Sequence, residues 1–445
     1  MPKPFARLLA SFSPTLRKAL SNLTWLSVDR VLRIGGAIIV NAWLTRYLGT
    51  ELNGVMYYAL SFAGMFAPLA TLGLDALVVR DIVRNKAGRD ELLGTAFVLR
   101  LTGASLAVLI AVGAVMAVRP GDGSTHWLVF LAGLGLTFQS FDVIDFWFQS
   151  QLQSKFTVYA KNAAFILLNL AKIGAILAGA DVEVFILLTS LEFAAGGIGL
   201  VMMYRHNGFS VTRWTFRPDI FRHLLSNAWP LVLTDFGVLL QARIDQVMLG
   251  EMLGNESVGL YAAAVKLTEP FGFIPMIIMT SVYPVIVRSK EWSEDVFYNR
   301  MKNLYRIMTI VTLGIGLPVS LFSDEIVHFL YGQAFSPSAA LVSLMIWSRV
   351  YANFGTARSI FISAENLFRH TLVCALSGSV VNIVVNYLLI PRLGVVGSII
   401  GTYASFTVTV FVLDAIVPRT RRNFRAMITG LLTFYRLSRK WDEND

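Results

Sequence analysis

Charged residues are scarce in this chain of 445 residues: Asp, Glu, Lys and Arg make up 15% of it, whereas they make up about one quarter of an average soluble domain. Hydrophobic residues account for 55%, and the mean hydropathy is +0.62. The apolar residues fall in blocks of about 20, the length of helix that crosses the hydrocarbon core of a bilayer. This composition excludes an ordinary soluble protein and predicts a polytopic membrane protein.

The residues that most often carry catalysis or bind metals are also rare. Cys374 is the single cysteine, so no intramolecular disulfide can form, and its apolar neighbours favour a space-filling role. The five histidines lack the spacing of zinc ligands. No Gly-rich phosphate-binding loop and no nucleophile elbow occurs in the sequence. We therefore predict no catalytic residue, no metal site and no cofactor.

Twelve apolar segments predict twelve membrane-spanning helices. A backbone in lipid must satisfy its own hydrogen bonds, and the alternating ten-residue strands of a barrel are absent from the sequence. The predicted spans are residues 23–44, 55–79, 92–118, 127–148, 157–178, 184–204, 224–249, 259–287, 303–322, 338–364, 370–391 and 396–417.

Lys and Arg are distributed unevenly between alternate loops. If the N-terminus is inside, the inside segments carry 25 of the 38 basic residues, and the outside loops carry only Arg46, Arg119 and Arg392. This bias predicts that both termini are cytoplasmic. It also accounts for much of the net charge of +10, so little remains to indicate nucleic-acid binding.

The C-terminal residues 418–445 form a basic segment that we expect to be a cytoplasmic tail. Within it, FRAMITGLLTFYRLSRK (424–439) places apolar residues on one side of a helix with basic residues around them. This pattern is typical of an amphipathic helix that lies on the anionic inner leaflet. The alternative is a solvated basic tail.

A short motif occurs twice. LGTELNG at 48–54 recurs as LGNESVG at 253–259, and the same offset of 205 residues maps Leu20-Ser21-Asn22 onto Leu225-Ser226-Asn227. The repeat predicts two six-helix lobes, residues 23–204 and 224–417, related by a pseudo-two-fold axis along the membrane normal. Residues 1–22 are then a cytoplasmic lead-in and residues 205–223 a cytoplasmic linker. Two such lobes can rock against each other and give alternating access.

Several ionisable residues lie deep inside the predicted spans, where each costs about 2.5–3.5 kcal/mol if it faces lipid. We expect most of them to line a shared aqueous cavity. The basic candidates for substrate binding are Arg30, Arg33, Arg100, Arg243, Lys266 and Arg349. The acidic candidates for ion coupling or pairing are Asp29, Asp142, Asp145, Glu192, Asp235, Asp245 and Glu269.

Arginine indicates the charge of the cargo. A guanidinium group stays ionised and binds phosphate or carboxylate oxygens through two parallel hydrogen bonds. A cationic cavity therefore predicts an anionic cargo. The alternative is that these charges form buried ion pairs that fix helix packing, such as Asp29–Arg33 or Lys266–Glu269, with no role in transport.

Four stretches resemble a known family in sequence and in order. TRYLGTELNGVMYYAL (45–60), LATLGLDALVVRDIVRN (69–85), FLYGQAFSPSAALVSLMIWSRV (329–350) and NIVVNYLLIPRLGVVGSIIGTYAS (382–405) are similar to the Wzx-type polysaccharide flippases. These belong to the multidrug/oligosaccharidyl-lipid/polysaccharide (MOP) exporter superfamily. The resemblance implies a V-shaped pair of six-helix lobes in the bacterial inner membrane.

The resemblance also implies a function. An undecaprenyl-pyrophosphate-linked oligosaccharide, such as the repeat unit of O-antigen lipopolysaccharide, capsule or exopolysaccharide, would move from the cytoplasmic to the periplasmic leaflet. Arg30 and Arg33 match by position the basic residues that meet the pyrophosphate or acidic sugars in the family. The expected partners are this lipid-linked oligosaccharide, membrane lipids and polysaccharide polymerase machinery. Coupling to H⁺ or Na⁺ is left open.

Four other functions compete with this interpretation. A multidrug exporter of the same superfamily would have an acid-dominated cavity, and a peptidoglycan-precursor flippase usually has fourteen spans. A membrane glycosyltransferase, polymerase or ligase could use Asp142-x-x-Asp145 as a carboxylate pair, but the largest internal loop, about 19 residues, is too small for a catalytic domain. The fourth is a membrane scaffold that transports nothing.

Overall fold

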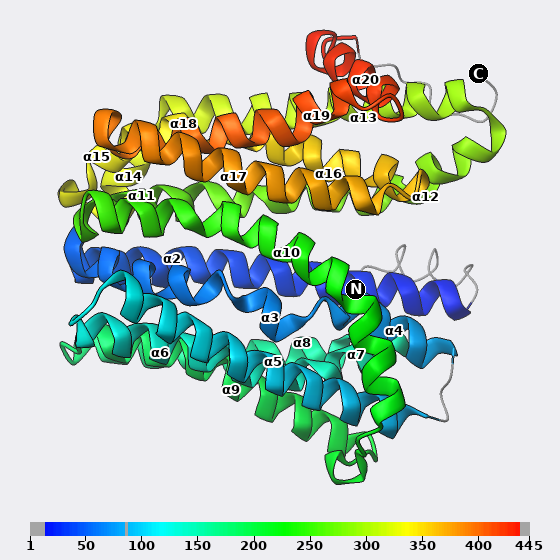
Figure 1. Ribbon diagram of the computed structural model, residues 1–445, viewed down its shortest axis with the longest axis horizontal. Coiled ribbons are helices and arrows are strands. Elements are labelled where there is room, and N and C mark those ends of the chain that lie inside the picture. The colour runs from blue at the N-terminus through cyan, green and yellow to red at the C-terminus, as the bar shows by residue number, and fades with distance from the viewer. Residues whose placement is uncertain (1–13, 85–87, 437–445) are drawn as a thin grey trace, which may run out of the picture. The chain divides into compact units, whose positions relative to one another are not determined.

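The structure is a computed structural model that describes residues 14–84 and 88–436; side chains are described for Arg33 and from residue 35 onward within these ranges. Helices make up the described chain, which contains no strand (Figure 1). Asp29 and Arg30 lie on helix α2 (Pro14–Gly64), but their side chains are outside the described residues.

The chain forms two compact units. The N-terminal unit comprises Met1–Leu44 and Phe62–Val232, and the C-terminal unit comprises Thr45–Ser61 and Leu233–Asp445. Residues 45–61, which follow the first predicted span, therefore pack in the C-terminal unit. The predicted division into lobes at 23–204 and 224–417 stays a prediction.

The N-terminal unit is built from helices joined by short connections. Within it α5, α6, α8 and α9 pack side by side in Figure 1. Its elements after α2 are α3 (Ala67–Thr71), α4 (Leu74–Arg84), α5 (Arg89–Val118), α6 (Gly123–Phe138), η1 (Gln139–Asp142), α7 (Val143–Ser150), α8 (Lys155–Leu177), α9 (Val182–His206) and η2 (Val211–Arg213). Helix α10 (Pro218–Met252) begins in this unit and continues into the other.

The C-terminal unit contains the remaining helices. They are α11 (Asn255–Thr268), η3 (Glu269–Gly272), α12 (Phe273–Trp292), α13 (Glu294–Leu321), α14 (Ser323–Tyr331), η4 (Gln333–Phe335), α15 (Pro337–Met345), α16 (Ser348–Ala364), α17 (Phe368–Leu393), α18 (Val395–Phe406), the π-helical turn η5 (Thr407–Val412), α19 (Leu413–Ile416) and α20 (Arg421–Leu432). Within it α17 packs along α18, and α13 packs against α20.

Eight helices in the described ranges are long and apolar enough to cross a membrane, or nine if the bent pair Gly35–Gly64 and Ala67–Arg84 is one span. The prediction of a polytopic all-helical membrane protein is confirmed, but the count of twelve is not. The predicted span 224–249 lies on α10, which carries Asp235, Arg243 and Asp245. The predicted span 338–364 is broken between α15 and α16, which have 9 and 17 residues.

The two copies of the repeated motif pack against each other inside the C-terminal unit. The second residue of each copy has a positive φ, +69° at Gly49 and +90° at Gly254, which glycine adopts without strain. The last residue of each copy, Gly54 or Gly259, lies where an added Cβ would overlap the backbone of the opposite copy. The motif therefore forms a helix crossing at which small residues let two backbones meet.

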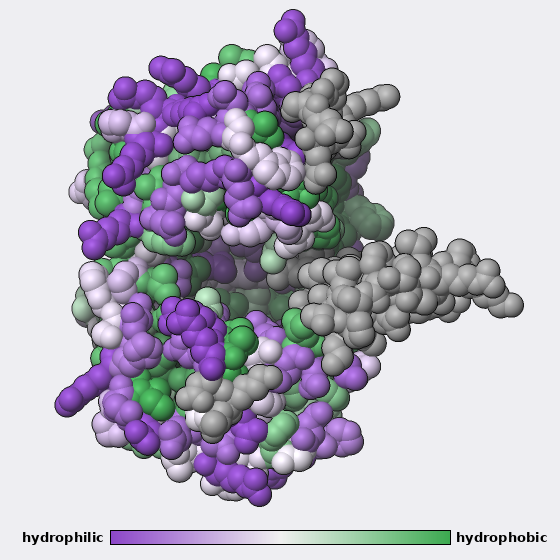
Figure 2. Space-filling model, turned by 90° about the vertical axis from the view of Figure 1, so that its right-hand side faces the viewer, coloured by the Kyte–Doolittle hydropathy of each residue, from purple (hydrophilic) through white to green (hydrophobic). Residues whose placement is uncertain are grey.

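The loops predicted to be cytoplasmic lie together at one end of each unit. In the N-terminal unit this end carries the start of α8 and the segment after α9; in the C-terminal unit it carries the connections α12–α13 and α16–α17 and helix α20 (Figure 1). Figure 2 views this end and shows hydrophilic side chains over much of each unit. The exposed basic residues of the segments predicted to be cytoplasmic include Arg84, Arg205, Arg213, Arg288, Arg369 and Arg425.

Helix α20 overlaps the first part of the predicted amphipathic segment 424–439 and docks on α13, whereas residues 437–439 of that segment lie outside the described residues. Met427 from its apolar side is fully buried, whereas Leu432 and Tyr435 are exposed. The Tyr305 hydroxyl donates to Asn423 Oδ1 over 3.0 Å, and the buried Arg306 donates to Thr433 Oγ1. Part of the apolar side is therefore covered by protein.

Candidate functional site

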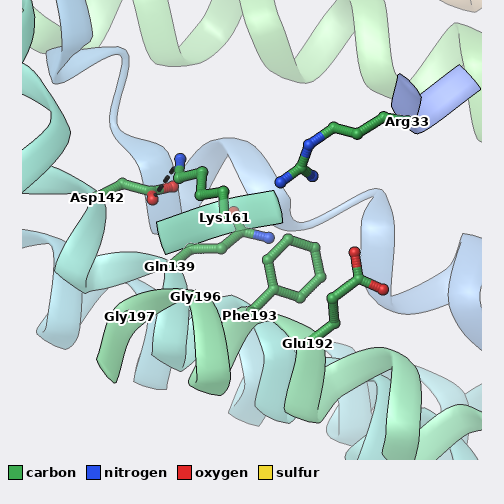
Figure 3. Close-up of a pocket in the computed structure, with 8 residues that line it drawn as sticks. All are labelled: Arg33, Gln139, Asp142, Lys161, Glu192, Phe193, Gly196 and Gly197. Carbon is green, nitrogen blue, oxygen red and sulfur yellow. Dashed lines mark ion pairs between the residues drawn. The ribbon is translucent and has the colours of Figure 1, made fainter. Parts of the chain in front are cut away.

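A pocket of about 150 Å³ lies within the N-terminal unit. Four elements supply its walls, and Figure 3 shows their side chains converging on one space. The lining residues are Arg33 from α2, Gln139 and Asp142 from η1, Lys161 from α8, and Glu192, Phe193, Gly196 and Gly197 from α9. Three of the predicted site residues, Arg33, Asp142 and Glu192, are thus brought together.

Carboxylates neutralise the lysine at the wall of this pocket. Lys161 Nζ lies 2.7 Å from Asp142 Oδ1 and 3.6 Å from Asp145 Oδ2. Asp145 also accepts a hydrogen bond of 2.6 Å from the Thr157 hydroxyl. Both predicted acids of the Asp142-x-x-Asp145 pair are therefore engaged by a cation on α8, as expected for a structural ion pair and not for a free catalytic carboxylate pair.

The other charged side chains around the pocket also include both positive and negative groups. Lys172 Nζ on α8 lies 3.4 Å from Glu192 Oε2. Arg33 Nε donates to Asn162 Oδ1 over 3.1 Å, and its guanidinium carbon lies 5.4 Å from the Phe165 ring centroid. Two basic and two acidic side chains thus line the pocket, Arg33, Lys161, Asp142 and Glu192, and behind them Asp145 pairs with Lys161 and Lys172 with Glu192. The formal net charge of the pocket is zero.

Arg100 lies elsewhere in the N-terminal unit and does not line this pocket. Its side chain on α5 is buried, with 2% exposed, and its Nη1 lies 3.2 Å from Asp75 Oδ1. The guanidinium also packs 5.3 Å from the centroid of the Phe146 ring. These contacts give Arg100 a partner within the protein.

A second cluster, in the C-terminal unit, contains three of the predicted basic residues. Lys266 Nζ on α11 lies 3.4 Å from Glu269 Oε2, and Arg243 on α10 and Arg349 on α16 act on the same carboxylate. We call these four residues the cationic cluster. Three cations around one acid give it a formal charge of +2, in contrast to the neutral pocket of the N-terminal unit.

Local structure explains how Glu269 meets these cations. Pro270 and Gly272 belong to the 3₁₀ turn η3, which separates α11 from α12 and begins at Glu269. A Cβ placed on Gly272 would lie 3.7 Å from Arg349 Nη1, so the arginine approaches the turn closely. Among the described residues, Arg349 Nε has no hydrogen-bond partner. The cluster therefore retains a buried donor that an anionic ligand could use.

Asp245 forms a separate polar centre in the C-terminal unit. It is 3% exposed, and its carboxylate accepts hydrogen bonds from the Tyr261 hydroxyl at 2.6 Å, the Asn386 amide at 2.6 Å and the Thr402 hydroxyl at 2.7 Å. All three of these donors are neutral. Asp235 lies further back on α10 and is exposed, away from these partners.

One group of possible metal ligands does not fit a metal ion. The ligand atoms of His370, Cys374 and Asp414 lie within 4.8 Å of one another. Arg358 donates to both oxygens of Asp414, at 2.8 and 2.6 Å, and to Cys374 Sγ at 3.4 Å. The guanidinium group thus takes the place and supplies the charge that a cation would.

The sequence reveals the charged residues but not their neutral partners. Gln139, Phe193 and Gly196 in the pocket resemble many other residues of these spans, so no pattern distinguishes them. Asn382 and Asn386 are different, because two amides spaced by four residues in an apolar span are costly unless they serve a polar site. That spacing was a signal for the centre around Asp245.

Known proteins resemble this chain in sequence. Residues 19–290 match a family described as polysaccharide biosynthesis protein, and residues 230–388 match the MatE family. The probable flippase AglR of Haloferax volcanii is 25% identical over 173 residues, which are 37% of this chain and 35% of that protein. The match to that relative thus spans about a third of its length.

Solved structures resemble the chain in fold. A multidrug resistance MATE family transporter of the MOP superfamily, inward-facing, is 15% identical with a TM-score of 0.67, over 93% of this chain and 99% of that chain. The lipid II flippase MurJ, in an inward closed conformation, is 13% identical with a TM-score of 0.65, over 94% of this chain and 92% of that chain. At these identities the similarity concerns the fold alone, and it agrees with the predicted fold class.

Proposed function

Because the chain belongs to the polysaccharide biosynthesis protein family, we propose that it is a flippase of the MOP superfamily that moves a lipid-linked oligosaccharide across a membrane. The cargo we propose is a saccharide on undecaprenyl pyrophosphate, the repeat unit of a surface polysaccharide. It would move from the cytoplasmic to the periplasmic leaflet of the bacterial inner membrane, with both termini in the cytoplasm. The gathering of basic loops at one end of each unit supports this orientation.

The observation that carries the proposal is the cationic cluster. Lys266 forms an ion pair with Glu269, and Arg243 and Arg349 act electrostatically on the same carboxylate. Guanidinium groups bind phosphate oxygens through charge-assisted hydrogen bonds. A pyrophosphate could replace Glu269 as the partner of these cations. We therefore assign the pyrophosphate to this cluster and not to Arg100, whose partner is Asp75.

We also propose that a cation drives transport, and that its site is Asp245. A buried carboxylate without a cationic neighbour is costly unless it binds a proton or a metal ion. The hydroxyl oxygens of Tyr261 and Thr402 lie beside the Asp245 carboxylate, the Asn386 amide nitrogen donates to it, and oxygen ligands suit H⁺ or Na⁺. Asn386 Oδ1 has no hydrogen-bond partner among the described residues, which leaves a further oxygen for a cation.

A multidrug exporter or a peptidoglycan-precursor flippase of the same superfamily is the alternative. A transporter of organic cations would place acids where this chain places Arg243, Lys266 and Arg349, so the charge of the cationic cluster argues against it. A peptidoglycan precursor also carries pyrophosphate, and the cluster does not discriminate against it. The peptidoglycan-precursor flippase and the proposed polysaccharide flippase differ only in the saccharide that the lipid carries.

Deletion of the gene in its host, followed by complementation, tests the proposal. With a flippase missing, lipid-linked repeat units accumulate on the cytoplasmic side and the surface polysaccharide is lost. Wild type should restore the polymer, and a variant with Arg243→Gln and Arg349→Gln should not. Arg392→Gln, which alters an exposed arginine, is the matched control and should complement fully. Intact polysaccharide with increased sensitivity to cationic drugs in the deletion strain would favour the multidrug exporter.

A further inference from the structure

We propose that the pocket of the N-terminal unit is a saccharide subsite that holds one neutral sugar ring of the cargo. The inference rests on the proposed function, since it concerns the same lipid-linked substrate. The charged groups of this pocket would recognise sugar hydroxyl groups, whereas the cationic cluster would bind the pyrophosphate.

The size of the pocket suits one ring. Its volume is about 150 Å³, below the ~300–1,000 Å³ of sites for drug-sized ligands. A whole oligosaccharide or a polyprenyl chain does not fit in it. A single monosaccharide at the end or in the middle of a repeat unit does.

The polar groups of the pocket match sugar hydroxyls. Asp142 and Glu192 present carboxylates and Gln139 presents an amide, and Figure 3 shows the Glu192 carboxylate and the Gln139 amide directed into the space. Planar groups with two donor or acceptor atoms bind adjacent hydroxyls of a pyranose through paired hydrogen bonds. Bonds that involve an ionised group are the stronger ones, so the two carboxylates give affinity, and the amide adds a third point that fixes the orientation of the ring.

An aromatic ring stands among these polar groups. Phe193 lies between Gln139 and Glu192 in the close-up (Figure 3) and is 44% exposed. Aromatic side chains stabilise a complex by covering apolar area and by presenting the negative face of the ring to positively polarised hydrogens. The C–H face of a pyranose is such a partner. A free anion would gain nothing from the negative face of a phenyl ring in this position.

The charge balance excludes the pyrophosphate from this pocket. The three basic and three acidic side chains around it compensate each other, and Lys161 is engaged by both Asp142 and Asp145. A group with two or more negative charges would meet Asp142 and Glu192 at close range, and like charges repel strongly where water is scarce. A neutral hydroxylated ring meets no such penalty.

Glycine at position 196 keeps the space open. A Cβ placed there would have its nearest neighbour at 4.0 Å, at Lys161 Cγ, so the residue borders empty volume and not packed backbone. A larger side chain would therefore fill the pocket without first displacing its walls. Gly197 differs, because a Cβ there would lie 3.2 Å from the Phe141 ring. Gly196 is accordingly the position for a steric test.

The test compares two lipids on the purified full chain in detergent by native mass spectrometry. The probes are bare undecaprenyl pyrophosphate and the lipid-linked repeat unit extracted from the deletion strain. The variants are Gly196→Val and Phe193→Leu, with Gly174→Val as control, because Gly174 lies in a helix of the same unit with open space around its Cβ position. Thermal unfolding of each variant verifies that it is folded.

We expect Gly196→Val and Phe193→Leu to weaken binding of the repeat-unit lipid about 10-fold or more and to leave bare undecaprenyl pyrophosphate within twofold of wild type. Gly174→Val should bind both lipids as wild type does. Unchanged binding of the repeat-unit lipid by both pocket variants would overturn the inference, and so would an equal loss of the two lipids, since the pocket would then take the pyrophosphate. If wild type binds neither lipid, the proposed function fails together with the subsite. If it binds both and the pocket variants do not discriminate, only the subsite fails.

Discussion

Arg358 on α16 and Asp414 on α19 form a buried bidentate ion pair across 56 residues of sequence. Nε and Nη2 of the arginine donate to the two carboxylate oxygens at 2.8 and 2.6 Å, and the two residues are 7% and 0% exposed. His370 Nε2 lies 2.8 Å from the same carboxylate. The pair and His370 therefore tie α16, α19 and α17 of the C-terminal unit together.

Removal of one partner of this pair should destabilise the protein strongly, because it leaves the other charge buried and uncompensated. We expect Arg358→Met to cost about 3–5 kcal/mol of unfolding free energy, seen as a large drop in the unfolding temperature in detergent. The double variant Arg358→Met with Asp414→Leu should recover part of that loss. Arg422→Met, which removes an exposed arginine paired with Glu294, should cost no more than about 1 kcal/mol. Equal effects of Arg358→Met and Arg422→Met would mean that the buried pair is solvated.

The repeat crossing gives a second stability prediction. Gly54→Ala and Gly259→Ala each place a methyl group against the backbone of the opposite copy, so the helices must separate. We expect each to cost about 1–3 kcal/mol or more, as overpacked positions do. Gly174→Ala has open space and should be neutral or slightly stabilising, because alanine is the better helix former. Unfolding temperatures for the three variants provide the comparison, and a neutral Gly54→Ala would contradict the close crossing.

A third prediction concerns the connection between α5 and α6. Asp122 caps α6, where its side chain accepts hydrogen bonds from the Thr125 hydroxyl and backbone N–H. These bonds lower the pKa of Asp122 below its usual 3.8. The stabilisation is therefore present above that usual value and is lost as the pH falls through the pKa of the folded state. We expect Asp122→Ala to cost about 1 kcal/mol near neutral pH. The difference should vanish in strong acid when unfolding is followed against pH, and a pH-independent difference would assign the effect to packing.

The sequence allows the helices to be predicted better than their partners. Residues 157–178 were expected as a span and form α8 at Lys155–Leu177, because a block of apolar residues is a local signal. The segment 224–249 is also helical, but it contains polar residues whose hydrogen-bond and ion-pair partners lie on helices distant in sequence. Arg33 bonds Asn162, 129 residues away, and no local pattern could select that partner. Charges could be found from sequence, but the arrangement that separates a neutral pocket from a cationic cluster depends on tertiary packing.

The cationic cluster gives a prediction for binding. Arg349→Gln removes a guanidinium whose buried Nε has no hydrogen-bond partner in the part of the chain that the structure describes. It should weaken undecaprenyl pyrophosphate binding about 10-fold, since a hydrogen bond to a charged group contributes about 1.5–3 kcal/mol. Glu269→Gln removes the internal competitor for Arg243, Lys266 and Arg349 and should strengthen binding of the same lipid. Native mass spectrometry of each variant measures both effects, and Arg392→Gln is the control. Opposite signs for the two variants are diagnostic, because general damage to the site would weaken both.

The last prediction concerns the driving ion. In proteoliposomes, an H⁺ or Na⁺ gradient across the membrane, inward or outward, should accelerate translocation by the wild type. If Asp245 binds the coupling cation, Asp245→Asn should abolish this acceleration. The variant should still bind the lipid-linked substrate. Tyr261→Phe and Thr402→Val each remove one hydroxyl from the carboxylate and should raise the ion concentration needed for half-maximal rate. Ion replacement separates the two cations: a rate that follows Na⁺ at constant pH identifies a sodium site, and a rate that follows pH without Na⁺ identifies a proton site. Asp235→Asn alters an exposed acid on the same helix and should keep the ion dependence. A wild-type rate that responds to neither gradient, or an Asp245→Asn variant that still responds, would place coupling elsewhere and leave Asp245 with a structural role.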